Sequence, residues 1–236
     1  MRVGENPTKF ARHNSGLVQM KVKQPEALLA ATVVYIPRLT DYYADSLNIL
    51  KASLRSLQQT LKQPYDLMVY DNGSCPEVLE FLQAELAAER IQWLWLSGGN
   101  MKKIGAWNHI FGAAQSDYTY YFDCDILHRP GWYERSMAVF EAFPEAGMVN
   151  AAPIPMKAPE ERDNVLSSTL EKLDRLDDVT VERGIFASDA WFSELGESLG
   201  ANPESFLAKA KRFDQVKATR GGGAAFAQVW HAQFLA

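Results

Sequence analysis

The sequence predicts an α/β protein with a mostly parallel sheet flanked by helices and a helical excursion in its C-terminal part. Short apolar segments alternate with longer amphipathic segments, which is the order expected of strands joined by crossover helices. The apolar segments near the N-terminus are continuous rather than alternating, as strands covered on both faces are. Charged and glycine-containing turns separate these segments, so the sheet is expected to be open and parallel.

The first strand is expected in "ATVVYIP", residues 31–37, where Pro37 stops an apolar run. Leucines recur at spacings of three and four up to Leu61, which predicts an amphipathic helix ending near Pro64. The further strands are expected over residues 66–70, 91–96, 118–122 and 147–152. The further helices are expected over residues 76–90, 104–111, 131–143, 188–200 and 203–213, with Gly200 as a C-terminal stop.

Three parts of the chain differ in character. Residues 1–30 have a mild basic excess and are expected to form an arm, and residues 31–152 carry the strand and helix alternation. Residues 153–236 begin with a charged stretch and are expected to be mainly helical. The thin apolar stripe over residues 160–176 leaves two interpretations, a homodimer contact or packing back on the sheet.

Composition excludes several classes of protein. The net charge of −5 argues against a nucleic-acid partner, which would require clustered Lys and Arg. Two cysteines, Cys75 and Cys124, are too few for a disulfide framework, so a cytoplasmic protein is expected, with peripheral attachment to the inner membrane as an alternative. No apolar run is long enough to cross a bilayer, and no signal peptide is recognisable.

Polar residues follow each of the first four expected strands. In a parallel sheet these positions share one edge, where ligands bind and helix N-termini point their free amides. "DNGS" (71–74) and "SGGN" (97–100) are each also common turn sequences, so neither is specific alone. The residues in question are Pro37, Arg38, Asp41, Asp71, Asn72, Ser74, Gly98, Gly99, Asn100, Lys102, Lys103, Asp123 and Asp125.

The motif "YTYYFDCD" places two carboxylates one residue apart after an aromatic strand. Two like charges this close repel each other unless something positive lies between them. Asp123 and Asp125 therefore either cap a turn or hold a cation, and carboxylate oxygens suit Mg²⁺ or Mn²⁺ bound to a diphosphate.

The order of these motifs over residues 31–152 resembles the nucleotide-binding half of the GT-A glycosyltransferases, a Rossmann-like fold, and most closely the inverting enzymes of family 2. Asn100, Ala106 and Asn108 match that family's N-x-G-x-x-x-A-x-N stretch at the right separation. Lys102 departs from the pattern because it stands where the family usually has Gly.

The resemblance implies a donor site and a divalent cation, Mn²⁺ or Mg²⁺. It implies that Asp71 binds the nucleobase beside Pro37 and Arg38, that Asp123 reaches the ribose or the metal, and that Asp125 holds the cation. His231 is the candidate third ligand, although a single His between Trp and Phe is at least as often a core residue. The full nucleotide-binding set is Pro37, Arg38, Asp71, Asn72, Asn100, Lys103, Asn108, Asp123 and Cys124, and the metal set is Asp123, Asp125 and His231.

The resemblance also implies transfer of a sugar from a UDP-sugar, or from a GDP-sugar, to the hydroxyl of an unknown glycan, lipid or small molecule. Inverting transfer needs a carboxylate base. The family's base follows the segment at which this chain ends, so Asp189 and Glu194 are substitute candidates, both expected on a helix surface. The chain is accordingly expected to be a fragment, or to bind donor without efficient transfer.

Two alternatives stay open. A haloacid dehalogenase-type phosphohydrolase would use Asp123 as its nucleophile, but its motif follows a first strand, and Leu127 stands where Thr or Val is usual. A non-catalytic binding module would keep the donor site and lack the base.

Overall fold

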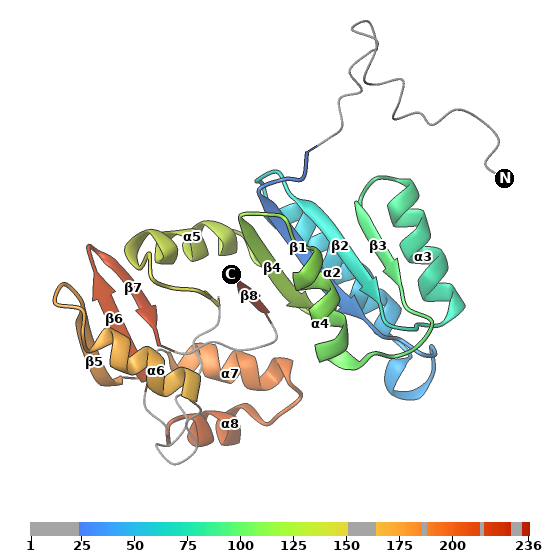
Figure 1. The fold of residues 1–236 in the computed structure, drawn as a ribbon. Coiled ribbons are helices and arrows are strands. Elements are labelled where there is room, and N and C mark those ends of the chain that lie inside the picture. The colour runs from blue at the N-terminus through green and yellow to red at the C-terminus, as the bar shows by residue number, and fades with distance from the viewer. Residues whose placement is uncertain (1–23, 151–163, 186–187, 213–214, 228–232) are drawn as a thin grey trace, which may run out of the picture.

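The computed structural model describes residues 24–150, 164–185, 188–212, 215–227 and 233–236 (Figure 1). Its main sheet has the strand order β3-β2-β1-β4-β8. The first four are parallel to one another, and β8 runs antiparallel to β4. The strands are β1 (Leu28–Val34), β2 (Asp66–Asp71), β3 (Trp93–Leu96), β4 (Tyr118–Asp123) and β8 (Gln233–Leu235). The predicted α/β class with a mostly parallel sheet is confirmed.

Helices cover both faces of this sheet. One face carries α2 (Ser46–Thr60), α3 (Pro76–Ala87) and the start of α5 (Trp132–Ala142), which share the larger core cluster with the strands. The other face carries α4 (Lys102–Ala113), whose Ala106 and Ile110 pack on β1 and β2 (Figure 1). Because both faces are covered, β2 is buried along its whole length, as its continuous apolar sequence predicts.

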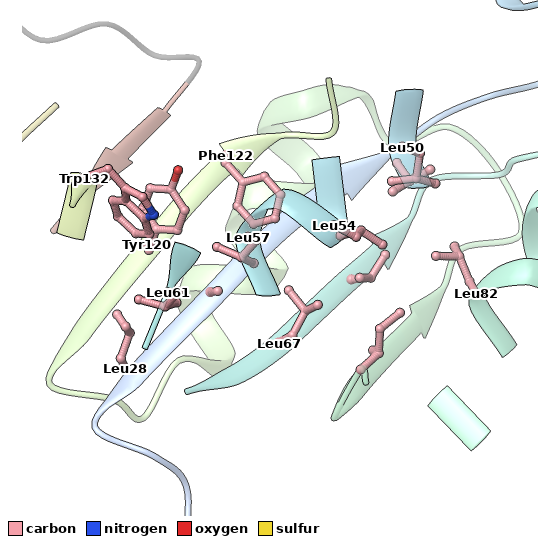
Figure 2. Packing of buried hydrophobic residues seen from close by; sticks show 14 of the residues in the cluster. Leu28, Leu50, Leu54, Leu57, Leu61, Leu67, Leu82, Tyr120, Phe122 and Trp132 are labelled. Atoms are coloured by element: carbon pink, nitrogen blue, oxygen red, sulfur yellow. The ribbon is translucent and has the colours of Figure 1, made fainter. Parts of the chain in front are cut away.

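The predicted leucine stripe of α2 forms the centre of the larger core. Leu50, Leu54 and Leu57 are at most 2% exposed and lie over the sheet (Figure 2). Burial of each such side chain contributes roughly 1.5–3 kcal/mol. A short 3₁₀ turn (Asp41–Tyr43) precedes α2, so the α-helix itself begins later than Tyr43.

The aromatic strand β4 is anchored from both faces. Tyr120 and Phe122 point into the larger core, where the Tyr120 ring lies 4.0 Å from that of Trp132 (Figure 2). Tyr121 and Asp123 point to the opposite face, because side chains alternate along a strand, and Tyr121 packs edge-on to Trp107 of α4. The aromatic run thus delivers Asp123 to the α4 side of the sheet.

The C-terminal part contains a second sheet that the sequence analysis missed. Residues 153–236 were expected to be mainly helical, but β5, β6 and β7 form an antiparallel sheet. Gly221 and Gly222 make the tight turn between β6 and β7 with φ of 54° and 86°, the conformation that a two-residue hairpin requires. Its elements are α6 (Asn164–Leu173), β5 (Thr180–Ile185), α7 (Asp189–Ser198), α8 (Pro203–Ala210), β6 (Gln215–Arg220) and β7 (Gly223–Phe226).

Other boundaries also differ from expectation. β1 begins at Leu28 and ends at Val34, before the tyrosine that precedes Ile36 and Pro37. The strand expected over 147–152 is, within the described residues, only an isolated bridge between Val149 and Leu235.

The C-terminal helices agree better with the sequence analysis. α7 and α8 are confirmed, and Gly200 has the left-handed φ of 69° expected of a helix stop. In α6, Leu170 packs against Val216 of β6, so that part of the apolar stripe packs back on the protein. Among the residues that the structure describes, no helix has the length and apolarity needed to span a bilayer.

Candidate functional site

The loops that follow β1, β2 and β3 are joined at the carboxyl edge of the sheet. The amide of Asn72 donates to the Val34 carbonyl at 2.8 Å, and that of Cys75 donates to the Ile36 carbonyl at 2.8 Å. The Ser74 hydroxyl accepts from the Ile36 amide at 3.0 Å. These bonds hold the loop containing Pro37 and Arg38 beside the "DNGS" turn, as the common edge of parallel strands predicts.

Asp71 is built into its own turn. Its side chain is 1% exposed, and its carboxylate accepts from the Gly73 amide at 3.1 Å and from the Ser74 amide at 3.2 Å. Gly73 has a φ of +92°, a left-handed conformation that favours glycine. The turn-forming role of "DNGS" is therefore observed, and the predicted contact between Asp71 and a nucleobase stays a prediction.

Asn72 and Asn100 form a clamp between two of the loops. The Asn72 side chain accepts from the Met101 amide at 2.7 Å and donates to the Asn100 side-chain oxygen at 3.1 Å. That same oxygen accepts from the Lys102 amide at 2.7 Å, at the first residue of α4. The two asparagines, distant in sequence, therefore fix the start of α4 at this edge.

Lys102 has a left-handed backbone conformation, which glycine adopts more readily than lysine. Its φ is +58°, in the left-handed region that costs a residue with a side chain roughly 1–2 kcal/mol. Lys102 therefore carries backbone strain at the position where the family pattern has Gly.

Asp123 is bound by a lysine and a tyrosine. The Lys103 ammonium lies 2.6 Å from Oδ1 and 2.9 Å from Oδ2 of Asp123, and the Tyr121 hydroxyl donates to Oδ1 at 2.7 Å. The same ammonium lies 5.1 Å from the centre of the Trp107 ring and 5.4 Å from that of Tyr121. Burial, and then the nearby Asp123 charge, raise the pKa of Tyr121, so its hydroxyl stays protonated and donates.

The next two residues differ in exposure. Burial raises the pKa of the Cys124 thiol to about 12, with the Asp125 and Asp123 charges adding to the effect, so Cys124 is a protonated thiol at neutral pH. The side chain of Asp125 is exposed in the turn after β4. Of the two motif carboxylates, Asp125 alone faces solvent openly, whereas Asp123 is only partly accessible.

The remaining predicted nucleotide contacts differ in exposure. The Arg38 guanidinium is exposed, forms an ion pair with Asp41 at 3.5 Å and lies 5.6 Å from the Tyr43 ring centre. Asn108 is exposed in the middle of α4, and Pro37 is half-buried.

The implied divalent cation fits Asp125 better than Asp123. A cation at Asp123 would face the Lys103 ammonium already bound there, and like charges at that distance repel. Asp125 alone is compatible with a cation that takes most of its ligands from a diphosphate and water, as Mg²⁺ does. Within the described residues, no group of three His, Cys, Asp or Glu side chains is arranged to hold a metal. His231 lies outside the described residues.

The two candidate bases lie on α7 and have different partners. Glu194 pairs with Arg129, which belongs to the loop after the "DCD" motif. Asp189, in the first turn of α7, pairs with Lys211 just after α8. Both carboxylates are exposed, as expected, but only Glu194 is joined to the loop of the motif.

Two contributions were missed in the sequence analysis. Tyr121 was interpreted only as part of an apolar strand, although its position two residues before Asp123 puts both side chains on one face. Trp107 was also missed, and its ring centre lies 5.1 Å from the Lys103 ammonium. The period of two along β4 was the available signal for Tyr121, whereas the Trp107 contact depends on how α4 packs.

The sequence profile described as "Glycosyl transferase family 2" matches residues 42–213. The structure of residues 1–349 of S. aureus TarS in complex with UDP-GlcNAc has a TM-score of 0.41 at 15% identity, covering 58% of this chain and 36% of that one. The mannosyltransferase PcManGT from Pyrobaculum calidifontis, in complex with GDP-Man and Mn²⁺, has a TM-score of 0.40 at 16% identity, covering 58% and 39%. The chain thus spans well under two thirds of either structure. No curated protein matches the sequence.

Proposed function

Because the chain belongs to glycosyl transferase family 2, we propose that it binds a nucleotide-diphosphate sugar at the carboxyl edge of its sheet and transfers the sugar to an acceptor hydroxyl. A UDP-sugar is favoured on frequency alone, and a GDP-sugar is the second candidate. The observation that carries the proposal is the convergence, at one edge, of the Asn72–Asn100 clamp, the start of α4 and the Lys103–Asp123 pair.

Each part of this edge has a chemical role in the proposal. The start of α4 carries the positive end of the helix dipole, so the donor phosphates would lie beside it, although the Lys102 amide itself already donates to Asn100. Asp71 would contact the nucleobase, and Asp123 would reach the ribose or the metal. Asp125 would hold the divalent cation, which, when bound with the donor, stabilises the charge that develops on the departing diphosphate.

In the proposed reaction, the acceptor oxygen attacks the anomeric carbon from the face opposite the nucleotide. The bond from that carbon to the diphosphate breaks, and the acceptor proton passes to a carboxylate. Of the two candidates we favour Glu194, because Arg129 ties it to the loop that follows the motif. Asp189 is instead tied to α8 through Lys211 and would act only in holding the helices together.

The donor site is tested by isothermal titration of UDP and of GDP into the protein, with and without Mn²⁺. We expect one nucleotide to bind in a Mn²⁺-dependent manner, and Asp125→Ala to remove most of that dependence. Asp117→Ala, just before β4 at the opposite end of the strand, is the matched control and should bind as the natural sequence does. If neither nucleotide binds, the proposed function is wrong.

The base is tested by comparing Glu194→Gln with Asp189→Asn in transfer from the bound nucleotide-sugar to a panel of acceptors. Removal of a general base lowers the rate roughly 10²–10⁴-fold, and we expect this loss in Glu194→Gln with nucleotide binding unchanged. A loss of transfer rate confined to Asp189→Asn would instead identify Asp189 as the base. Nucleotide binding with no transfer by the natural sequence would instead support the non-catalytic binding module.

The phosphohydrolase alternative has less support. Its nucleophile would be Asp123, whose two carboxylate oxygens are both within 3 Å of the Lys103 ammonium. Its expected signature, an aspartyl-phosphate at Asp123, would decide in its favour.

A further inference from the structure

Lys103 binds one of the two motif carboxylates that would otherwise both attract a divalent cation. The ammonium contacts both oxygens of Asp123, at 2.6 and 2.9 Å, and Tyr121 donates to one of them. The side chains of Lys103 and Asp123 are 33% and 28% exposed, so the pair is partly shielded from water. A positive charge is therefore already present where the motif would otherwise present two free carboxylates to a metal.

The surroundings of the ammonium favour this arrangement. The rings of Trp107 and Tyr121 lie 5.1 and 5.4 Å from the Lys103 nitrogen, close enough for cation–π attraction. Tyr121 and Trp107 also pack edge-on with ring centres 5.0 Å apart, which fixes both rings relative to Asp123. Lys103 is thus held by a carboxylate and two aromatic faces, unlike the neighbouring Lys102, whose side chain is exposed.

We propose that Lys103 is a resident cation that keeps Asp123 from binding a metal until a nucleotide diphosphate arrives. The proposal rests on the proposed function, since it concerns the same donor site. Diphosphate oxygens offer the ammonium a second anionic partner, and the flexible Lys103 side chain reaches them by leaving Asp123. Asp123 then becomes available, so the cation and the nucleotide bind together rather than separately.

This arrangement predicts how removal of the Lys103 charge alters metal binding. Without nucleotide, the natural protein would present only Asp125 to a cation, and Lys103→Gln would present both carboxylates. An opposite charge at this range changes the affinity of a carboxylate for a proton roughly 10- to 1,000-fold. We therefore expect Lys103→Gln to bind Mn²⁺ at least about tenfold more tightly than the natural sequence does in the absence of nucleotide.

Isothermal titration of Mn²⁺ alone tests the proposal with matched variants. Lys102→Gln removes the same charge one residue earlier and should leave Mn²⁺ affinity unchanged. In the double variant with Lys103→Gln and Asp123→Asn the gain should disappear, because the freed carboxylate is absent. A thermal melt of each variant establishes that it is folded before titration.

Adding UDP or GDP completes the test. We expect nucleotide to raise the Mn²⁺ affinity of the natural sequence at least about tenfold more than that of Lys103→Gln, in which Asp123 is already free. Equal Mn²⁺ affinity of the natural sequence and Lys103→Gln without nucleotide would overturn the proposal, as would an equal gain in Lys102→Gln. The titration of metal alone does not depend on nucleotide binding, so its failure is distinguishable from failure of the proposed function.

Discussion

The parallel-sheet region (24–150) and the C-terminal region (164–227) are held together by different forces. The first contains two apolar clusters, one on each face of the sheet, with leucines, tyrosines and a tryptophan almost fully buried. The second has a small cluster around Leu170 and Val216, and ion pairs between exposed side chains join its elements. The difference indicates that the parallel-sheet region is the more stable of the two, because exposed ion pairs contribute little.

The largest expected change in stability comes from creating a cavity in the larger core, and the same change in the C-terminal cluster should cost less. Leu57→Ala, at a side chain with 0% exposure in the larger core, should lower the free energy of unfolding by about 4 kcal/mol. Leu170→Ala should cost about 2 kcal/mol or less, because the smaller cluster around it collapses more easily. Urea unfolding of both variants checks this, and a larger loss from Leu170→Ala would reverse the comparison.

A buried histidine makes the parallel-sheet region sensitive to acid. Burial lowers the pKa of His128 from 6.5 to about 4, and its Nδ1 lies 3.0 Å from the Ser56 hydroxyl. Between these two pKa values the unfolded chain takes up a proton that the folded chain does not. Stability is therefore full above pH 6.5 and falls with decreasing pH, by roughly 3 kcal/mol down to about pH 4.

Urea unfolding between pH 7 and pH 5 measures this slope above the range where carboxylates dominate. His128→Asn should flatten it, and His109→Asn, at an exposed position on α4, should leave it in place. An unchanged slope in His128→Asn would mean that another group is responsible.

The contact between α5 and β7, which joins the two regions, is tested at Gly223. A Cβ there would collide with the Cβ of Ala142, so α5 and β7 would have to move apart. Gly223→Ala should cost roughly 1–3 kcal/mol. Gly147→Ala, with no atom within 4 Å of the added carbon, is the control, and equal melting temperatures of the two variants would show that the joint is loose.

Replacement of Lys102 by glycine should stabilise the parallel-sheet region. Lys102→Gly removes the cost of a side chain at a φ of +58° and should raise the free energy of unfolding by about 1 kcal/mol. Lys102→Ala retains a Cβ and should give no such gain. A loss of stability in Lys102→Gly would show that this backbone is not strained.

The smallest effect is expected from an ion pair of the C-terminal region. Arg183 contacts both carboxylate oxygens of Asp174 at 2.7 Å, and both side chains are about half exposed. Arg183→Gln should cost less than about 1 kcal/mol, and the cost should shrink in high salt. Melting curves at low and high salt check this, and a large, salt-independent loss would contradict the weak role given to these pairs.

The sequence predicts the fold of the parallel-sheet region better than that of the C-terminal region. In the parallel-sheet region, continuous apolar strands and the leucine period of α2 are local signals, and both were correct. β5 has no comparable pattern, since Glu182, Arg183 and Gly184 are exposed, and its pairing with β6 depends on residues distant in sequence. The Gly221–Gly222 pair was a usable hairpin signal in a part of the chain that was expected to be mainly helical.

At the candidate site, the sequence predicts which loops meet but not every contact between their side chains. The common edge of the four parallel strands predicts which loops meet, and Asn72 and Asn100 do contact each other there. The pairing of Lys103 with Asp123 depends on the rotation of α4 about its axis, which tertiary packing decides. The predicted roles of Asp71, Asp125 and Glu194 toward a donor and an acceptor remain proposals.

Hydrogen–deuterium exchange with and without the nucleotide that titration finds to bind tests the central claim most directly. The account predicts slower exchange in peptides that cover residues 71–75, 99–104 and 123–126, with smaller changes over 180–185 and 215–226. Protection confined to the C-terminal region, or no protection at the carboxyl edge of the parallel strands, would contradict it.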